Sequence, residues 1–100
     1  MLMSLTGKQN QFLRGLGNQL KAAVSIGRDG ISPAVLTTVE QTLAAKELVK
    51  VKLLEGFAGD RHAAGQELAA QTGAELVQVL GKTILLYHRK VDEVVIVLPE

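Results

Sequence analysis

The sequence predicts an α/β fold, a two-layer α/β sandwich with a mixed sheet. Apolar residues recur at helical spacing in three segments, near 7–20, 33–46 and 61–72, and short apolar or alternating runs separate them. Two further runs flank Gly81-Lys82, a pair typical of a β-hairpin turn. Strands separated by helices normally run parallel, whereas hairpin strands are antiparallel, so the sheet is expected to be mixed. No linker or repeat divides residues 1–100, which predicts one domain.

The first helix has a clear start. Thr6 and Gln9 have the spacing of a capping box, and apolar residues follow at helical spacing from Phe12 to Leu20. Gly15 and Gly17 weaken the helix by roughly 0.5 to 1 kcal/mol each relative to Ala. The helix therefore depends on tertiary packing, which allows an early end.

Residues 22–26 read as a short strand that leads into a glycine-bracketed turn. The next helix, at 33–46, is the clearest in the sequence, because Ser32 is a good N-cap and Pro33 suits the first helical position. Apolar and charged residues then alternate along residues 48–54. Valines and leucine occupy one face of this strand, and Lys50 and Lys52 occupy the other, which predicts a positive face that meets water.

The third helix, at 61–72, is capped by Asp60 and ended by Gly73. Four of its residues are expected to face inward. These are Ala63, Ala64, Leu68 and Ala69.

The hairpin predicts a register. With Gly81 and Lys82 as a type II′ turn, Val79 opposes Ile84. The same register sets Val77 opposite Leu86 and Glu75 opposite His88. Residues 94–98 are strongly apolar and predict a last strand, ended by Pro99, which lacks an N–H for pairing.

The turn Gly27-Arg28-Asp29-Gly30 is the main functional candidate. A Gly-x-x-Gly loop between a strand and a helix is the arrangement with which KH-type modules clamp a nucleic-acid backbone. Glycine lets a ligand backbone approach closely, and the following helix N-terminus attracts phosphate. Arg28 would contact the phosphate. The structural alternative is a tight strand-to-helix turn with no ligand.

The charge distribution supports a polyanionic partner. The formal net charge is only +1, but the chain before Asp29 carries four basic residues and no acidic one. A second acid-free basic group lies at 82–90. Segregated charge attracts a polyanion even when the net charge is small. The alternative is a set of ordinary solvated lysines and arginines.

Nothing in the sequence predicts catalysis. The chain has no cysteine, and His62 and His88 have no carboxylate spacing typical of a metal site or a triad. We therefore expect no enzyme activity, no metal and no cofactor. Tyr87 could stack on a base, but a single Tyr on a strand is more often a packing residue.

The expected location is the cytoplasm. The start of the chain is too short for a signal-peptide core, and no apolar run reaches membrane-spanning length. The absence of cysteine fits a reducing compartment.

Four motifs carry a family resemblance. They are Leu5-Thr6-Gly7-Lys8-Gln9 with Phe12-Leu13-Arg14, then Ile26-Gly27-Arg28-Asp29-Gly30, then Glu47-Leu48-Val49-Lys50-Val51-Lys52, and Gln78-Val79-Leu80-Gly81-Lys82 leading to Leu86-Tyr87. In this order they resemble the YhbY-like bacterial proteins, which are stand-alone CRM domains (chloroplast RNA splicing and ribosome maturation). The resemblance covers nearly the whole chain.

This resemblance implies an RNA-binding domain similar in fold to the C-terminal domain of translation initiation factor three. It also implies association with precursors of the large ribosomal subunit, with the Gly-x-x-Gly loop as part of the RNA surface. Two residues depart from the family pattern. Asp29 sets a carboxylate at the loop tip, where it either holds the loop or weakens phosphate contact. His88 displaces the basic end of the last motif to Arg89.

Two functions remain open at this point. The first is an RNA-binding assembly factor of the large ribosomal subunit that contacts ribosomal RNA, and the second is a protein-interaction or dimerisation module motivated by the apolar C-terminal strands. The oligomeric state is undetermined. The predicted RNA-binding residues are Gly27, Arg28, Asp29, Gly30, Lys8, Arg14, Lys21, Lys50, Lys52, Lys82 and Arg89.

Overall fold

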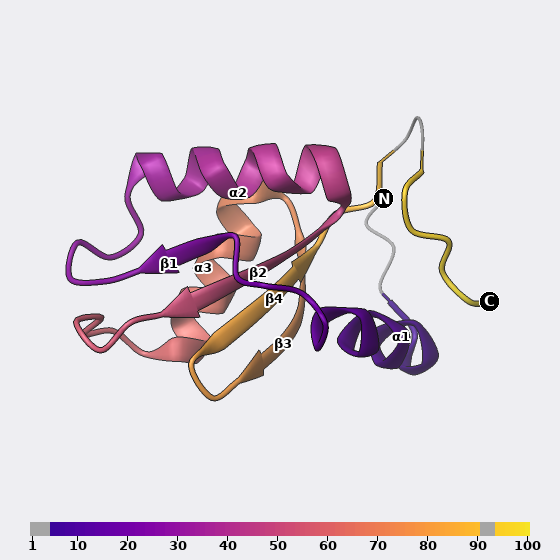
Figure 1. Cartoon of the computed structure of the whole chain (residues 1–100), viewed down its shortest axis with the longest axis horizontal. Helices are drawn as coiled ribbons and strands as arrows, with labels where there is room; N and C mark the ends of the chain where they lie inside the picture. Colours follow the sequence, from indigo (N-terminus) through magenta and orange to yellow (C-terminus); the bar gives the residue numbers. More distant parts are fainter. Residues whose placement is uncertain (1–4, 91–93) are drawn as a thin grey trace.

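Two helices cover one face of a four-stranded mixed sheet (Figure 1). The computed structural model describes residues 5–90 and 94–100. Within them the order is α1 (Gly7–Gly17), β1 (Val24–Ile26), α2 (Pro33–Lys46), β2 (Leu48–Leu53), α3 (Arg61–Thr72), β3 (Glu75–Leu80) and β4 (Thr83–Tyr87). The strand order is β1-β2-β4-β3. β1 and β2 are parallel and β4 is antiparallel to both its neighbours, which confirms the predicted mixed α/β sheet.

The helix boundaries follow from the predicted caps. Thr6 and Gln9 form a complete capping box, and the side chains of Ser32 and Asp60 accept backbone N–H groups at the starts of α2 and α3. α2 spans the predicted residues. α1 ends at Gly17, three residues before the outer limit of the prediction, as its glycines allow.

The main core lies between the sheet and the helices α2 and α3. Alternate residues of β2 and β4 point into it, and α2 contributes Val39 and Leu43. Leu68 and Ala64 of α3 are buried there, and Ala69 is partly buried. Ala63 is exposed, so the prediction that it faces inward was wrong.

α1 packs on the opposite face of the sheet. Its Leu13 is completely buried in a second cluster with Leu48, Leu85 and Tyr87, which alternate with the residues of the main core. Gly17 lies directly on Leu85, since a Cβ at this position would be 2.6 Å from a Leu85 methyl carbon. A side chain at this position would therefore have to displace the buried Leu85.

The face of β2 that carries lysines is only partly open to water. The Lys50 ammonium donates hydrogen bonds to the backbone oxygens of Gly17 and Leu20, at 3.2 and 3.3 Å. Lys50 thus satisfies carbonyl groups at the end of α1. Lys52, two residues further on, is exposed. The predicted water-facing positive face is correct for Lys52 and wrong for Lys50, because α1 covers that part of the sheet.

The hairpin has the predicted turn but a different register. Gly81 has a φ of +58° and Val79 pairs with Ile84, as expected. A β-bulge between Leu76 and Gln78 then places Leu76, not Val77, opposite Leu86. The bulge adds one residue to β3, so Val77 turns to the α1 face.

The bulge also changes the end of the hairpin. Glu75 pairs with Tyr87, so the predicted pairing of Glu75 with His88 was wrong. His88 is exposed, and its N–H donates to the backbone oxygen of Glu47. Tyr87 is only 2% exposed, so it is a packing residue and is not available to stack on a base.

Residues 94–98 do not form the predicted strand. They run alongside α1 (Figure 1), and Ile96 and Leu98 pack against the α1 cluster. The N–H groups of Val95 and Ile96 donate to the Glu47 carboxylate rather than to a neighbouring strand. Ile96 and Leu98 are thus partly buried without sheet pairing, whereas Val94, Val95 and Val97 of the same segment stay exposed.

Glu47 is the buried charge that holds this arrangement. It is the C-cap of α2, with a left-handed φ of +66° and no exposed surface. Its carboxylate accepts a hydrogen bond from the backbone N–H of Lys90, at 2.7 Å, in addition to those from Val95 and Ile96. Burial by itself raises the pKa of Glu47, but three backbone N–H donors and the charge of Lys90 bring the pKa below its ordinary value of 4.5.

The first prediction concerns Glu47→Gln. The neutral amide forms weaker hydrogen bonds and presents an NH₂ to the backbone donors, so we expect a loss of about 2 kcal/mol or more in the free energy of unfolding at pH 7. Because the pKa of the carboxyl is lowered in the folded state, its contribution is complete above about pH 4.5. It declines as the pH falls through the lower folded-state pKa. The difference between wild type and variant should therefore shrink in acid.

Urea unfolding between pH 7 and pH 3 measures this difference. Glu40→Gln is the matched control, since Glu40 lies exposed on the same helix and should change stability by less than about 0.5 kcal/mol. A Glu47→Gln variant as stable as the wild type at pH 7 would contradict the assigned role.

Candidate nucleic-acid interface

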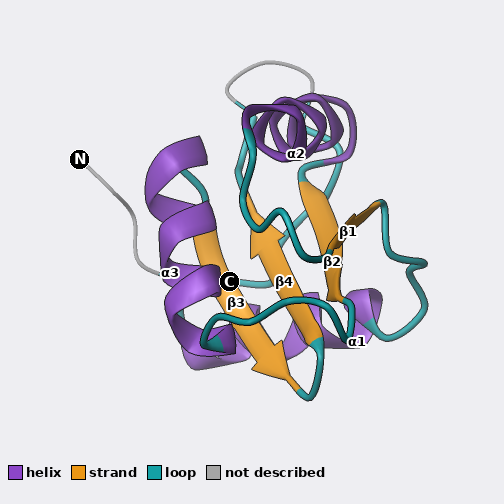
Figure 2. Ribbon diagram, turned by 90° about the vertical axis from the view of Figure 1, so that its left-hand side faces the viewer, coloured by secondary structure: helices purple, strands orange, loops and turns teal. Residues whose placement is uncertain are grey.

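Three loops meet at one end of the molecule. They are the Gly27–Gly30 turn after β1, residues 54–60 after β2, and the hairpin turn at Gly81-Lys82, and Figure 2 looks onto this end. Parallel strands end at the same edge of a sheet, so the first two loops lie side by side. Backbone hydrogen bonds from Leu54 to Ile26 and from Leu53 to Lys82, at 2.8 and 2.7 Å, join the three.

The Gly27–Gly30 turn is closed by one backbone hydrogen bond. The Gly30 N–H donates to the Gly27 oxygen at 3.1 Å, which leaves Arg28 and Asp29 exposed at the tip. Only Gly30 has a positive φ, +67°, and so needs glycine for its conformation. Gly27 does not need it, and a Cβ there would make an ordinary 3.6 Å contact with Leu54.

The turn leads into the capped N-terminus of α2. Ser32, and not Asp29, caps this helix, with its hydroxyl 3.2 Å from the Val35 N–H. The positive end of the α2 dipole therefore lies just behind the turn. An exposed Arg28 five residues before the start of a helix is an arrangement that favours an anionic group.

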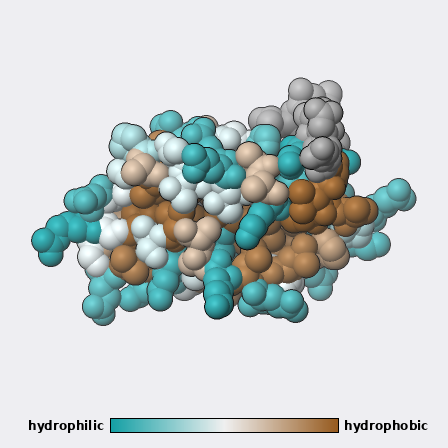
Figure 3. Space-filling model, turned by 45° about the horizontal axis from the view of Figure 1, so that its top comes forward, coloured by the Kyte–Doolittle hydropathy of each residue, from teal (hydrophilic) through white to brown (hydrophobic). Residues whose placement is uncertain are grey.

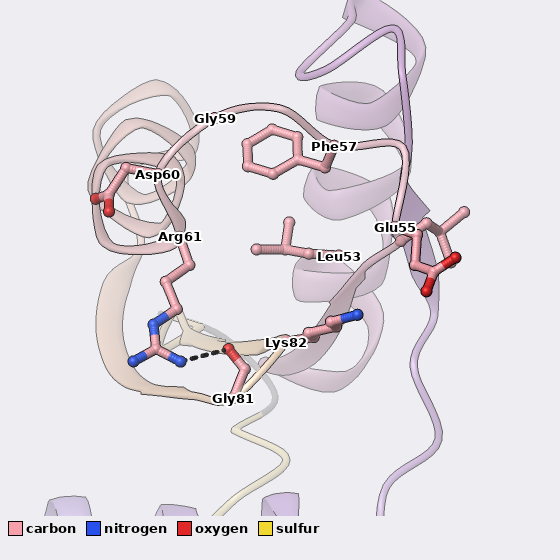
Figure 4. A pocket seen from close by; sticks show the side chains of 9 residues that line it. Leu53, Glu55, Phe57, Gly59, Asp60, Arg61, Gly81 and Lys82 are labelled. Atoms are coloured by element: carbon pink, nitrogen blue, oxygen red, sulfur yellow. Dashed lines mark hydrogen bonds between the residues drawn. The ribbon is translucent and has the colours of Figure 1, made fainter.

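The loop after β2 passes directly against the turn. A Cβ added to Gly56 would lie 3.3 Å from the Arg28 nitrogen, so these two backbones touch. The same loop forms the roof of a hollow of about 600 Å³ (Figure 4). The residues that line it are Leu53, Leu54, Glu55, Phe57, Gly59, Asp60, Arg61, Gly81 and Lys82.

The hollow adds residues that the sequence analysis did not single out. Arg61 reaches across it and donates to the Gly81 oxygen at 3.1 Å, and Phe57 lies over Leu53 (Figure 4). The available signal was the spacing Gly56-Phe57-Ala58-Gly59 before the Asp60 cap. It repeats the strand, Gly-x-x-Gly and helix order of residues 24–33.

Basic residues at this end come from four elements. Arg28, Lys52, Arg61 and Lys82 are all exposed. Lys52 belongs here because it pairs with Ser25 and Thr83 near the ends of their strands. The acidic residues nearby are Asp29, Glu55 and Asp60, of which Asp60 is bound to the Ala63 N–H.

The other predicted residues do not join this group. Lys8 and Arg14 belong to α1, at the opposite end of the 39 Å long axis (Figure 1). Arg89 follows β4 at the end away from the hairpin turn. Lys21 is exposed in the segment between α1 and β1, and Lys50 is bound to the backbone oxygens of Gly17 and Leu20. The structure thus brings together only Arg28, Lys52 and Lys82 of the predicted basic residues, and the others lie on separate elements.

No group of three metal-binding side chains occurs within the described ranges 5–90 and 94–100. In the same residues, no helix combines the length and the apolar character needed to cross a bilayer.

Comparison with known proteins identifies the family. The CRS1 / YhbY (CRM) domain family matches residues 5–88, and the chain therefore belongs to it. This confirms the resemblance inferred from the four motifs.

Individual relatives agree with this assignment. The chain is 33% identical over 95 residues to the probable RNA-binding protein YqeI of Bacillus subtilis, covering 95% of this chain and 99% of YqeI. It is 37% identical over 87 residues to a probable RNA-binding protein of Pseudomonas aeruginosa, and the match covers 87% of this chain and 84% of that protein. Its fold is similar to the solution structure of the hypothetical protein SAV1595 from Staphylococcus aureus, with a TM-score of 0.80 and 34% sequence identity. The match covers 96% of this chain and 100% of SAV1595.

Proposed function

We propose that this protein binds RNA, holding its phosphate backbone at the Gly27–Gly30 turn, without catalysing a reaction. The observation that carries the proposal is the exposed Arg28 in the turn that leads into α2, joined at the same end by Lys52 and Lys82. Phosphate contacts of this kind fix a strand without reading its sequence. Membership of the CRM family and the names of the relatives support RNA as the partner.

We further propose that the RNA is ribosomal RNA in precursors of the large ribosomal subunit, a role that belongs to the cytoplasm. An assembly factor has to bind incomplete particles and leave finished ones. Moderate affinity through a few phosphate contacts and shallow loops suits this requirement. The family resemblance of the four motifs supports the ribosomal assignment.

A second function, interaction with another protein, is favoured by one observation. Val94, Val95 and Val97 are 41, 52 and 81% exposed, and hydrophobic surface gathers at their end of the molecule (Figure 3). Exposed apolar groups of this kind support association with a partner or a second copy. Sedimentation of the wild type and of a Val95→Ser and Val97→Ser double variant tests this function. Equal monomer fractions at all concentrations would exclude dimerisation through these valines.

The second prediction is the salt dependence of RNA binding. Each phosphate neutralised on a single strand contributes about −0.7 to the slope of log K against log salt. Arg28→Ala should therefore make the slope shallower by about 0.7. Arg14→Ala, at the other end of the molecule, is the matched control and should change this slope less. Binding that does not respond to salt would contradict the phosphate mechanism.

The third prediction separates ligand approach from folding at the turn. Gly27 has no positive φ, and there is room for a Cβ at this position. The free energy of unfolding of Gly27→Ala should therefore lie within about 0.5 kcal/mol of the wild-type value. If RNA lies against the turn backbone, the same variant should bind RNA at least about fivefold more weakly. Gly30→Ala is expected to lose about 1 kcal/mol of stability as well, because of its φ of +67°. Unchanged RNA binding by Gly27→Ala would indicate a purely structural turn.

The fourth prediction concerns the biological partner. In gradient fractionation of cell extracts at low salt, the protein should co-sediment with large-subunit precursors and be scarce on translating ribosomes. Rising salt should release it into the free pool. The Arg28→Ala variant should be released at lower salt than Arg14→Ala. Finding the protein only on mature particles would refute the assembly role.

A further inference from the structure

We propose that the hollow beside the Gly27–Gly30 turn holds one unstacked base of the bound RNA against Phe57. This inference rests on the proposed RNA binding and goes beyond it, because the turn contacts only the strand backbone. It assigns a ligand class to Phe57 and Arg61.

The position of the hollow is the first argument. Residues 56–59 form a second Gly-x-x-Gly loop, which follows β2 and precedes a capped helix just as the first loop follows β1. The two loops touch, since a Cβ at Gly56 would lie 3.3 Å from the Arg28 nitrogen. A strand whose phosphate lies at Arg28 therefore has its neighbouring nucleotide within reach of the hollow.

The lining of the hollow is the second argument. Its floor is the buried Leu53, and the half-buried ring of Phe57 lies above it (Figure 4). A volume of about 600 Å³ is within the usual range for a small planar ligand. Proteins that bind single strands stack bases on aromatic rings in such places.

Gly59 sets the position of the ring. A Cβ at residue 59 would lie 2.7 Å from the tip of the Phe57 ring, so any other residue would push the ring from its place. The absence of a side chain at residue 59 therefore lets the ring lie along the loop. The position of the Phe57 ring is thus set by contacts within its own loop.

The rim of the hollow distinguishes a base from a free anion. Arg61 and Lys82 lie on it, and the hydrogen bond to the Gly81 oxygen uses one of the five guanidinium N–H donors of Arg61. The carboxylates of Glu55 and Asp60 also line the hollow, so an isolated phosphate meets both signs of charge. An apolar floor and aromatic wall between two cationic groups suit a nucleotide whose base lies inside and whose phosphate lies at the rim.

The test compares two single strands of ten nucleotides, oligoadenylate and a ribose-phosphate strand of equal length without bases. The wild type should bind oligoadenylate at least about fivefold more tightly, the lower end of what one base stacked on an aromatic ring contributes. Phe57→Leu, which keeps an apolar side chain, should reduce this preference to less than about twofold while leaving the salt slope unchanged. Phe57→Tyr should retain the preference.

Phe12→Leu is the matched control, since Phe12 is the other phenylalanine of the chain and lies exposed on α1. It should keep the wild-type preference. 2-Aminopurine placed in the strand should become more fluorescent on binding to the wild type, because the base leaves the stack of its neighbours, a readout that needs no variant.

The outcomes separate the two proposals. A preference for oligoadenylate that survives Phe57→Leu, or salt-sensitive binding with no preference and no change in 2-aminopurine fluorescence, would overturn the base site and leave RNA binding intact. Failure of the wild type to bind either strand at low salt would overturn both.

Discussion

The end of the molecule where α1 and residues 94–98 pack on the sheet depends on the hydrogen bonds of the buried Glu47 carboxylate. This carboxylate joins three segments: the end of α2, the start of β2 and the chain that follows β4. A charge with no exposed surface is stable only when its hydrogen-bonding capacity is satisfied, and backbone N–H groups satisfy it here. The chain after β4 is therefore turned back towards α1 instead of extending the sheet.

This closure leaves the two ends of the molecule with different properties. At one end, α1 and the C-terminal segment cover the sheet, and Lys50 is occupied by helix carbonyls. At the other end, β1, β2 and the hairpin finish in short loops with exposed cationic side chains. The cationic side chains at the loop end thus remain exposed to a polyanion.

The two Gly-x-x-Gly loops illustrate how the same spacing serves different purposes. In the first, Gly30 supplies a left-handed conformation and Arg28 is exposed at the tip. In the second, Gly56 and Gly59 have no positive φ, and their lack of a side chain leaves room for the Arg28 backbone and the Phe57 ring, respectively. Because both follow parallel neighbouring strands, they act on adjacent parts of one surface.

The sequence by itself determined the helices, their caps, the hairpin turn and the Gly27–Gly30 loop, because each depends on hydrogen bonds and periodicity within a few residues. Only the tertiary structure decided the bulge that turns Val77 to the α1 face, the role of Glu47 and the difference between Lys50 and Lys52. Those features depend on contacts between distant residues, such as Glu47 with Lys90 and Lys50 with Gly17, 43 and 33 residues apart. The hollow at Phe57 belongs to the same class, since its walls come from β2, the start of α3 and the hairpin, which only the packed sheet brings together.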